Sequence, residues 1–477
     1  MKQCNRFTPV LTRRDMLRTS ANGFGMLALA GLLGQEAAGQ QQADPTTRRT
    51  PLAPRQPHFR ARAKRIIFLF MHGGPSQVDT FDPKPLLTRD HGRPYPGPRP
   101  RVTFAATGNL MRSPWEFRQY GESGLPVSDL FPQVGRHADD LCVIRSVWAD
   151  NNAHGGALLQ LHTGSDTFVR PSIGSWITYG LGTENQNLPG FITICPTLGH
   201  GGVQNWSSAF LPADFQGTPI GSADIPCRNA TLAYLNAAQE TRSVQRLQLD
   251  LLREMNQRHL QPLGPDIALE GRINSFELAY RMQMEAPQVM DLSQETQATK
   301  RLYGIDNGPT DNFGRQCLLA RRFIERGVRF VQCSHSYKWD QHGNLRADHA
   351  RNALEVDQPI AALLTDLKHR GLLEDTLVWW GGEFGRTPTA QGGDGRDHNP
   401  NGWSMWLAGG GVRGGMAYGA TDDYGWYAVE NKVHMHDLHA TILYLMGLDH
   451  ERLTFRYAGR DFRLTDVHGH VVHDIIA

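Results

Sequence analysis

The sequence predicts an α/β protein with a mostly parallel central sheet, for three reasons. An unbroken apolar run from Arg65 to Met71 is typical of a strand buried on both faces. Farther along, predicted helices at 312–326 and 353–370 each precede a short strand, at 328–333 and 376–380, as parallel strands with crossover helices require. Polar side chains also follow several strands, and the carboxyl ends of parallel strands share one edge of a sheet.

The chain opens with a predicted export signal at residues 1–39. Arg13 and Arg14 precede an apolar stretch at 23–33, and small residues follow at 37–39. This stretch is too short to span a bilayer, and the layout is that of a cleaved signal. The twin arginines indicate the route that exports folded bacterial proteins. We therefore expect the export machinery as a partner, a periplasmic or cell-surface location, and no transmembrane anchor after processing.

Composition narrows the function of the mature chain. Residues 1–39 carry five basic and two acidic side chains, a net of +3, so the whole-chain charge of +2 leaves about −1 for the rest. That balance argues against a nucleic-acid partner. Residues 40–63 are rich in Gln, Pro and Arg, and we expect a disordered linker there. The six cysteines have no zinc-finger spacing, and one or two disulfides of undetermined pairing are compatible with export.

The remaining elements are predicted from apolar periodicity and helix-ending residues. A long helical insertion is expected at about 230–290, with helices at 230–258 and 268–286. The other predicted helices lie at 132–138, 154–163 and 435–446, and the other strands at 141–147, 191–195 and 405–408.

Four places put imidazoles or carboxylates just after predicted strands. They are His72 with Asp79, His154, Asp340 with His342, and Glu383 with His398. Each pair alone is weak, because an Asp-x-His spacing arises by chance as a loop hydrogen bond. All four at successive strand ends indicate a shared site. Mixed imidazole and carboxylate ligands suit Zn²⁺, Mn²⁺ or Fe better than Ca²⁺.

Several motifs resemble those of the alkaline phosphatase/sulfatase superfamily. Over nearly its whole length the chain looks like an exported bacterial family within it, the domain of unknown function 1501. The motifs are His72-Gly-Gly-Pro-Ser, Trp339-Asp-Gln-His-Gly, Gly382-Glu-Phe-Gly-Arg-Thr-Pro and Asp397-His-Asn-Pro, with the helix near 437–447. The resemblance implies an alkaline phosphatase-like three-layer sandwich over residues 64–477. It also implies a divalent metal, Zn or Mn, as one or two ions.

The superfamily pattern assigns metal-binding roles to the matching positions His72, Asp340, His342, Glu383 and His398. Two of these matches are loose, because His72 stands where the superfamily has an Asp and the spacing from Asp340 to His342 is shortened. Two further departures change the chemistry. His154 stands where the superfamily has its nucleophilic hydroxyl or modified Cys, and Phe384 replaces a metal-binding imidazole. These departures leave three roles open for His154: a metal ligand, a phosphoryl acceptor, or the mark of a site without turnover.

An anion site is expected beside the metal. His154 opens a helix with Gly155 and Gly156, and the free N–H groups of a helix N-terminus attract phosphate, sulfate or carboxylate. Arg386 is either a bidentate contact to an oxyanion or a structural salt bridge.

Three functional hypotheses remain. The first is an exported metal-dependent hydrolase of phosphate or sulfate esters, acting on an anionic small molecule or a glycan ester, with His154 and Arg386 as catalytic residues. The second is a non-catalytic member that binds an extracellular glycan or an exported protein. The third is an isomerase or transferase on the same scaffold.

Overall fold

The structure is a computed structural model that describes residues 51–99, 106, 108–232, 242–263 and 266–477. The predicted signal at 1–39, the first part of the predicted linker and residues 233–241 of the predicted insertion lie outside these residues.

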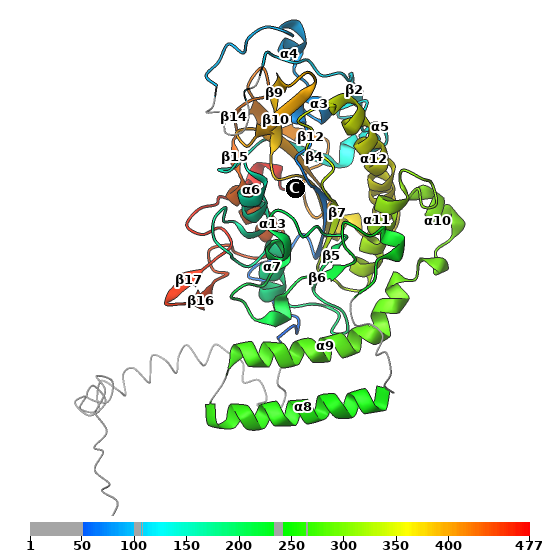
Figure 1. Ribbon diagram of the computed structural model, residues 1–477, viewed down its shortest axis with the longest axis vertical. Coiled ribbons are helices and arrows are strands. Elements are labelled where there is room, and N and C mark those ends of the chain that lie inside the picture. Colours follow the sequence, from blue (N-terminus) through cyan, green and yellow to red (C-terminus); the bar gives the residue numbers. More distant parts are fainter. Residues whose placement is uncertain (1–50, 100–105, 107, 233–241, 264–265) are drawn as a thin grey trace, which may run out of the picture. The chain divides into compact units, whose positions relative to one another are not determined.

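A central sheet organises the fold, and it contains nine strands among the described residues (Figure 1). Its order is β12-β4-β11-β8-β1-β7-β5-β6, and β15 also pairs with β4. The bounds are β1 Arg65–Met71, β4 Leu141–Trp148, β5 Phe191–Ile194, β6 Thr218–Ile220, β7 Phe330–His335, β8 Thr376–Gly381, β11 Trp403–Ala408, β12 Met416–Tyr418 and β15 Val433–His434.

The sheet is mostly parallel, as predicted. Strand β1 lies between β7 and β8 and pairs in parallel with both, with Ile66 opposite Phe330 on one side and Leu377 on the other. Within the described sheet only β11 runs against its neighbours, β4 and β8. The carboxyl ends of β1, β4, β5, β7 and β8 therefore lie at the same edge.

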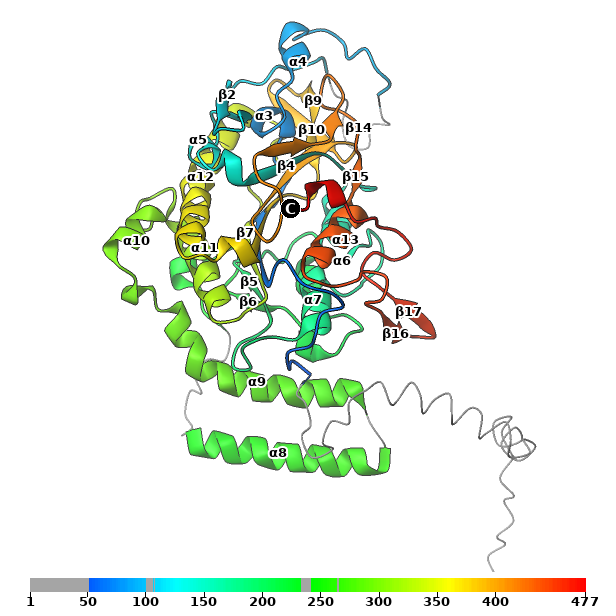
Figure 2. The same ribbon diagram turned by 180° about the vertical axis from the view of Figure 1, so that it is seen from behind.

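Helices cover both faces of the sheet and make a three-layer α/β arrangement (Figures 1 and 2). Helices α11 and α12 lie on one face, and α6, α7 and α13 on the other. The bounds of these and the shorter helices are α3 Gln77–Thr80, α4 Pro85–Arg89, α5 Pro132–Gly135, α6 His154–Thr163, α7 Ile173–Leu181, α10 Gln297–Leu302, α11 Asp311–Glu325, α12 Leu345–His369 and α13 Met435–Leu445. The predicted α/β class is confirmed.

Four two-stranded sheets decorate this body among the described residues. Their strands are β2 Phe117–Tyr120 with β3 Leu125–Ser128, β9 Gly385–Gln391 with β10 Gly395–Asn399, β13 Ala420–Thr421 with β14 Ala428–Glu430, and β16 Phe455–Tyr457 with β17 Arg460–Phe462. The β9–β10 hairpin occupies most of the stretch between Glu383 and His398, which the sequence analysis assigned to no element.

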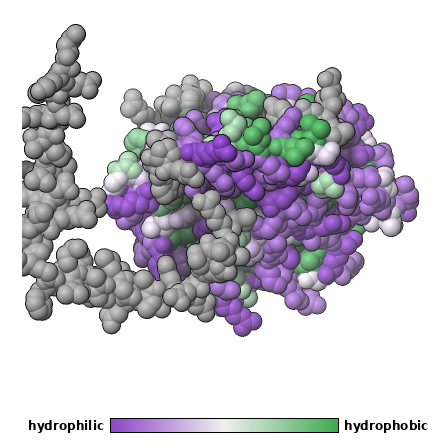
Figure 3. Space-filling view, turned by 90° about the horizontal axis from the view of Figure 1, so that it is seen from below, coloured by the Kyte–Doolittle hydropathy of each residue, from purple (hydrophilic) through white to green (hydrophobic). Residues whose placement is uncertain are grey.

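The predicted insertion forms two long helices, α8 Arg242–Leu263 and α9 Ile267–Met290. Ion pairs from Arg246 and Arg253 to Glu277 join them. On α8 an apolar stripe is exposed at Val244, Leu247, Leu251 and Met255. Figure 3, which views the molecule from below, shows apolar patches among mostly hydrophilic side chains.

Two expectations are corrected. Residues 51–63 are not a disordered linker, because Leu52 and Ala63 are buried and Arg55 and His58 donate backbone hydrogen bonds to Leu181 and Gly447. The five described cysteines are buried free thiols, so no disulfide forms among Cys142, Cys195, Cys227, Cys317 and Cys333.

No helix in the described residues is long and apolar enough to cross a membrane.

Candidate metal centre

The residues predicted for the site come together at the carboxyl edge of the sheet. His72 directly follows β1, Asp340 follows β7, and Glu383 follows β8. His154 is the first residue of α6, which follows β4, and His398 lies on β10. The shared strand direction brings these separate stretches together, as the sequence pattern predicted.

Asp340 lies at the centre of the cluster. Its Oδ1 is 3.0 Å from His342 Nε2 and 3.1 Å from His398 Nε2, and these two nitrogens are 3.0 Å apart. Three ligand-type atoms thus form a nearly equilateral triangle. The other carboxylate oxygen, Oδ2, is 3.2 Å from His154 Nε2. The buried His154 Nε2 has no hydrogen-bond partner among the described residues.

The outer nitrogen of each of these three histidines has an oxygen partner. His154 Nδ1 is 2.7 Å from Glu383 Oε1, and His398 Nδ1 is 2.7 Å from the Asn152 carbonyl. His342 Nδ1 contacts Gln391 Oε1. A hydrogen on each outer nitrogen places the lone pair of each imidazole on Nε2, the atom that faces Asp340. This arrangement is typical of metal-binding histidines and their supporting shell.

Glu383 is fully buried and serves as the support for His154. Its two oxygens accept the Gly73 N–H at 3.0 and 3.2 Å. Gly73 adopts φ +113°, and a Cβ there would lie 2.6 Å from the Asp340 backbone nitrogen, so only glycine allows this close approach. Although burial favours the neutral acid, the nearby His154 and His72 lower the pKa of Glu383 to about 2.

The carboxylates set the charge of the cluster. Burial favours neutral His154, but the nearby Asp340 carboxylate and the hydrogen-bonded Glu383 raise its pKa to about 9. Burial likewise opposes ionisation of Asp340, yet three histidines and Arg386 hold its pKa far below the usual range. Both carboxylates are therefore ionised, and Arg386 offsets part of their charge.

Arg386 lies beneath the cluster with no exposed surface. Its guanidinium donates to Asp340 Oδ1 at 2.7 Å and to the carbonyls of Gly73, Gly74, Trp339 and Arg396. Of the two roles the sequence left open, these contacts are those of the structural salt bridge. The oxyanion-contact role is not supported, because its donors already have partners.

Phe384 stands at the position where the superfamily pattern predicts an imidazole. Its ring stacks on His398, with centroids 4.3 Å apart, and lies 4.9 Å from the ring of His154. The side chain therefore packs between two of the imidazoles.

Two further candidate ligands were not predicted, His200 and Asp397. His200 stacks on His154 with centroids 4.8 Å apart, and Asp397 Oδ1 is 3.7 Å from His342 Nδ1. The position of each residue in the sequence could have indicated it. Asp397 immediately precedes His398, and His200 lies six residues beyond the end of β5.

The hydroxyls of Ser76 and Thr80, near His72 in the sequence, donate hydrogen bonds to other groups. Ser76 Oγ donates to Asp79 Oδ2 at 2.5 Å, and Thr80 Oγ1 donates to the Ser76 carbonyl at 2.8 Å. Both residues are buried. Neither hydroxyl faces the Asp340 cluster as a nucleophile would.

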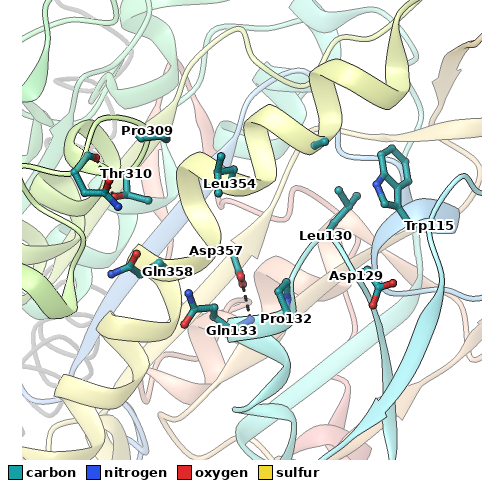
Figure 4. A pocket seen from close by; sticks show the side chains of 12 residues that line it. Trp115, Asp129, Leu130, Pro132, Gln133, Pro309, Thr310, Leu354, Asp357 and Gln358 are labelled. Carbon is teal, nitrogen blue, oxygen red and sulfur yellow. Dashed lines mark hydrogen bonds between the residues drawn. The ribbon is translucent and has the colours of Figure 1, made fainter.

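A cavity of about 410 Å³ elsewhere in the domain contains none of the cluster residues (Figure 4). It is lined by residues that include Trp115, Leu354 and Asp357. Burial raises the pKa of Asp357 to about 6, and the carboxylate accepts the backbone N–H groups of Gln133 and Val134 at 3.0 and 2.8 Å. Asp357 thus holds the start of α5, a structural role.

Solved structures that resemble this chain include the following three. The PsFucS1 sulfatase from Pseudoalteromonas sp. has 12% identity and a TM-score of 0.34, covering 82% of this chain and 69% of that one. A protein in the alkaline phosphatase superfamily from Vibrio parahaemolyticus has 9% identity and a TM-score of 0.34, covering 90% and 76%. The TAB5 alkaline phosphatase mutant His 135 Glu, with Mg bound in the M3 site, has 10% identity and a TM-score of 0.35, covering 81% and 99%.

A search of curated proteins finds no match to this chain. The family described as "Protein of unknown function (DUF1501)" matches residues 63–476, nearly the whole of the domain described above. The chain belongs to this family, as its motifs predicted.

Proposed function

We propose that this protein is an exported metal-dependent hydrolase of phosphate or sulfate esters, with one divalent cation held at the Asp340 cluster. The observation that carries the proposal is the triangle of Asp340 Oδ1, His342 Nε2 and His398 Nε2, with sides of 3.0 to 3.1 Å. Ligands bonded to one small cation at about 2.0–2.2 Å lie at comparable separations from each other.

The donor set fits Zn²⁺ or Mn²⁺. Three imidazole nitrogens and a carboxylate are ligands that these ions accept. The unpartnered Nε2 of His154 is the fourth candidate, because Glu383 holds its other nitrogen. When bound, the ion would supply Lewis acidity and lower the pKa of a bound water.

The chain's own residues would hold this centre rigid. Glu383 and the Asn152 carbonyl fix the ring orientations of His154 and His398, and Arg386 fixes Asp340 from beneath. Net hydrolysis consumes one water and releases an alcohol with phosphate or sulfate. Because Glu383 holds Nδ1 of His154 and Nε2 faces Asp340, a ligand role suits this residue better than that of a phosphoryl acceptor.

The substrate class follows from the resemblance to alkaline phosphatases and sulfatases and from the position of α6. His154 begins this helix, and no side chain of the described residues caps its N-terminus. Its free N–H groups favour an anionic group beside the cluster. An exported protein would encounter such esters as small molecules or on glycans.

A second candidate is a non-catalytic protein that keeps one ion and binds an anionic glycan or an exported partner. The observation that favours it is the commitment of the Ser76 and Thr80 hydroxyls to internal hydrogen bonds. The two candidates differ in whether the bound ester turns over.

Elemental analysis and an ester assay test the proposal together. We expect one equivalent of Zn or Mn in the wild-type protein and in His369→Ala, a matched control in which an exposed histidine at the end of α12 is removed. His398→Ala should lose the ion. Metal-loaded wild type should hydrolyse aryl phosphate or aryl sulfate esters. Stoichiometric metal without turnover of either ester would favour the non-catalytic candidate, and absence of metal would reject both.

A further inference from the structure

A second group of imidazoles lies beside the metal centre. One ring nitrogen of each of His72, His154 and His200 lies within 4.8 Å of those of the other two. We call these three residues the His72 group. Three histidines are a familiar zinc ligand set, so residue type alone would place a second cation here. The hydrogen bonds of His72 argue otherwise.

The tautomer of His72 is fixed by the backbone. The Tyr337 N–H donates to His72 Nδ1 at 3.2 Å, so this nitrogen is an acceptor. In a neutral imidazole the other nitrogen then carries the hydrogen. A metal binds through a lone pair, and Nε2–H has none to offer. The backbone N–H of Trp339 also donates to the His72 carbonyl at 3.0 Å, which holds the loop after β7 against His72.

His72 Nε2 is a donor without an acceptor. The side chain is fully buried, and Nε2 has no hydrogen-bond partner among the described residues. The nearest carboxylate oxygen, Glu383 Oε1, is 4.0 Å away, too far for a hydrogen bond. That oxygen already accepts from His154 and Gly73, which offset its charge. A buried donor left unpaired is costly, and such groups are commonly completed by a ligand.

The surroundings of this donor suit an anion. His154 opens the ten-residue helix α6, whose N-terminus is uncapped by any side chain. The next residue, Gly155, has open space where a Cβ would lie. The exposed His200 ring stacks on His154 and lies edge-on to His72, with centroids 5.7 Å apart. The group thus combines a buried N–H donor, a helix N-terminus and an opening to solvent.

We propose that the His72 group binds an oxyanion, with His72 Nε2–H as a donor to it, and that the chain holds one cation and not two. This assignment rests on the proposed function, because it places the phosphate or sulfate of the substrate next to the Asp340 cluster. It replaces the predicted role of His72 as a metal ligand with that of an anion-binding residue.

A pair of substitutions separates the two nitrogens of His72. In His72→Asn, the side-chain amide reaches the position of Nδ1 and can accept the Tyr337 N–H, while the Nε2–H donor is lost. In His72→Gln, the amide reaches the position of Nε2 and can donate from there. Both proteins are purified as full chains, their metal content is measured, and inorganic phosphate and sulfate are titrated by calorimetry.

We expect one equivalent of metal in wild type and in both variants. Phosphate and sulfate should bind His72→Asn about 10- to 100-fold more weakly than wild type, as for a lost hydrogen bond to a charged group. His72→Gln should bind them within about threefold of wild type, which also guards against a folding defect common to both variants. Near-ultraviolet circular dichroism checks that each variant is folded.

Other results overturn the assignment. Two equivalents of metal in wild type would overturn the single cation, and loss of metal in both variants would make His72 a ligand. Unchanged anion affinity in a folded His72→Asn would remove its role as a donor. Wild-type protein without stoichiometric metal would instead overturn the proposed function, and the phosphate titration of the same samples would still decide the role of His72.

Discussion

Replacing Arg396 by Met should be among the most destabilising single changes near the site. Arg396 and Asp79 are both fully buried, and they pair through two hydrogen bonds of 2.7 and 3.2 Å. The guanidinium also donates to the carbonyls of Thr387 and Met111 at 3.1 and 2.9 Å. Removing one partner of a buried pair leaves an uncompensated charge, which costs about 3–5 kcal/mol. The two carbonyls also lose their donor, so we expect the upper part of that range.

Urea unfolding of full-length Arg396→Met and wild type gives the difference in free energy of unfolding. Arg456→Met is the matched control, because Arg456 pairs with Asp461 at 3.2 Å on the surface, with side chains 67% and 55% exposed. Its loss should cost about 1 kcal/mol or less. The double variant Asp79→Asn/Arg396→Met should recover part of the loss, since no buried charge remains. If Arg396→Met costs no more than Arg456→Met, the buried pair does not hold β10, and the reasoning is wrong.

Three other predictions concern acid, chelation and thiols. Burial lowers the pKa of His162 to about 4 and those of His349 and His439 to about 3, whereas histidines of the unfolded chain titrate near 6.5. Stability should therefore be full above pH 6.5 and fall by about 1 kcal/mol per histidine per pH unit below it. A urea midpoint that stays flat between pH 7 and 5 would contradict this. Chelation should lower the free energy of unfolding by about 2.7 kcal/mol where the ion had been present at 100 times its Kd, a loss that His398→Ala should not show. A thiol reagent should modify the five described cysteines only after denaturation, and fewer reactive thiols in denaturant without reductant would reveal a disulfide.

The sequence predicted the position of the site because strand direction fixes which ends meet. Each of His72, Asp340 and Glu383 follows a buried strand by no more than five residues. Once β1, β7 and β8 run in parallel, these side chains must reach the same edge. The apolar run at Arg65 to Met71 and the helix–strand alternation after it were sufficient to establish that direction.

Hydrogen-bond roles could not be predicted in the same way, because they depend on neighbours distant in sequence. Arg386 meets the Asp340 carboxylate and four carbonyls only after three loops converge. The acceptor role of His72 Nδ1 depends on Tyr337, a non-glycine residue at φ 55°. His200 also adopts a positive φ, 44°, in a segment without periodicity. Backbone conformations of this kind leave no mark in composition or spacing.

The departures from the superfamily pattern at His154 and Phe384 are linked in the structure, because the two side chains lie side by side. An imidazole replaces the nucleophile at His154, and a phenyl ring replaces an imidazole at Phe384. In the structure Phe384 packs against both His154 and His398, while Glu383 takes the outer nitrogen of His154. The imidazole lost at one position is thus supplied at the other, 4.9 Å away, and the phenyl ring fills the space between. Under the proposed function, such a site would hold one ion and would offer no hydroxyl for covalent catalysis, so water, and not a side chain, is the nucleophile that the proposed hydrolysis requires.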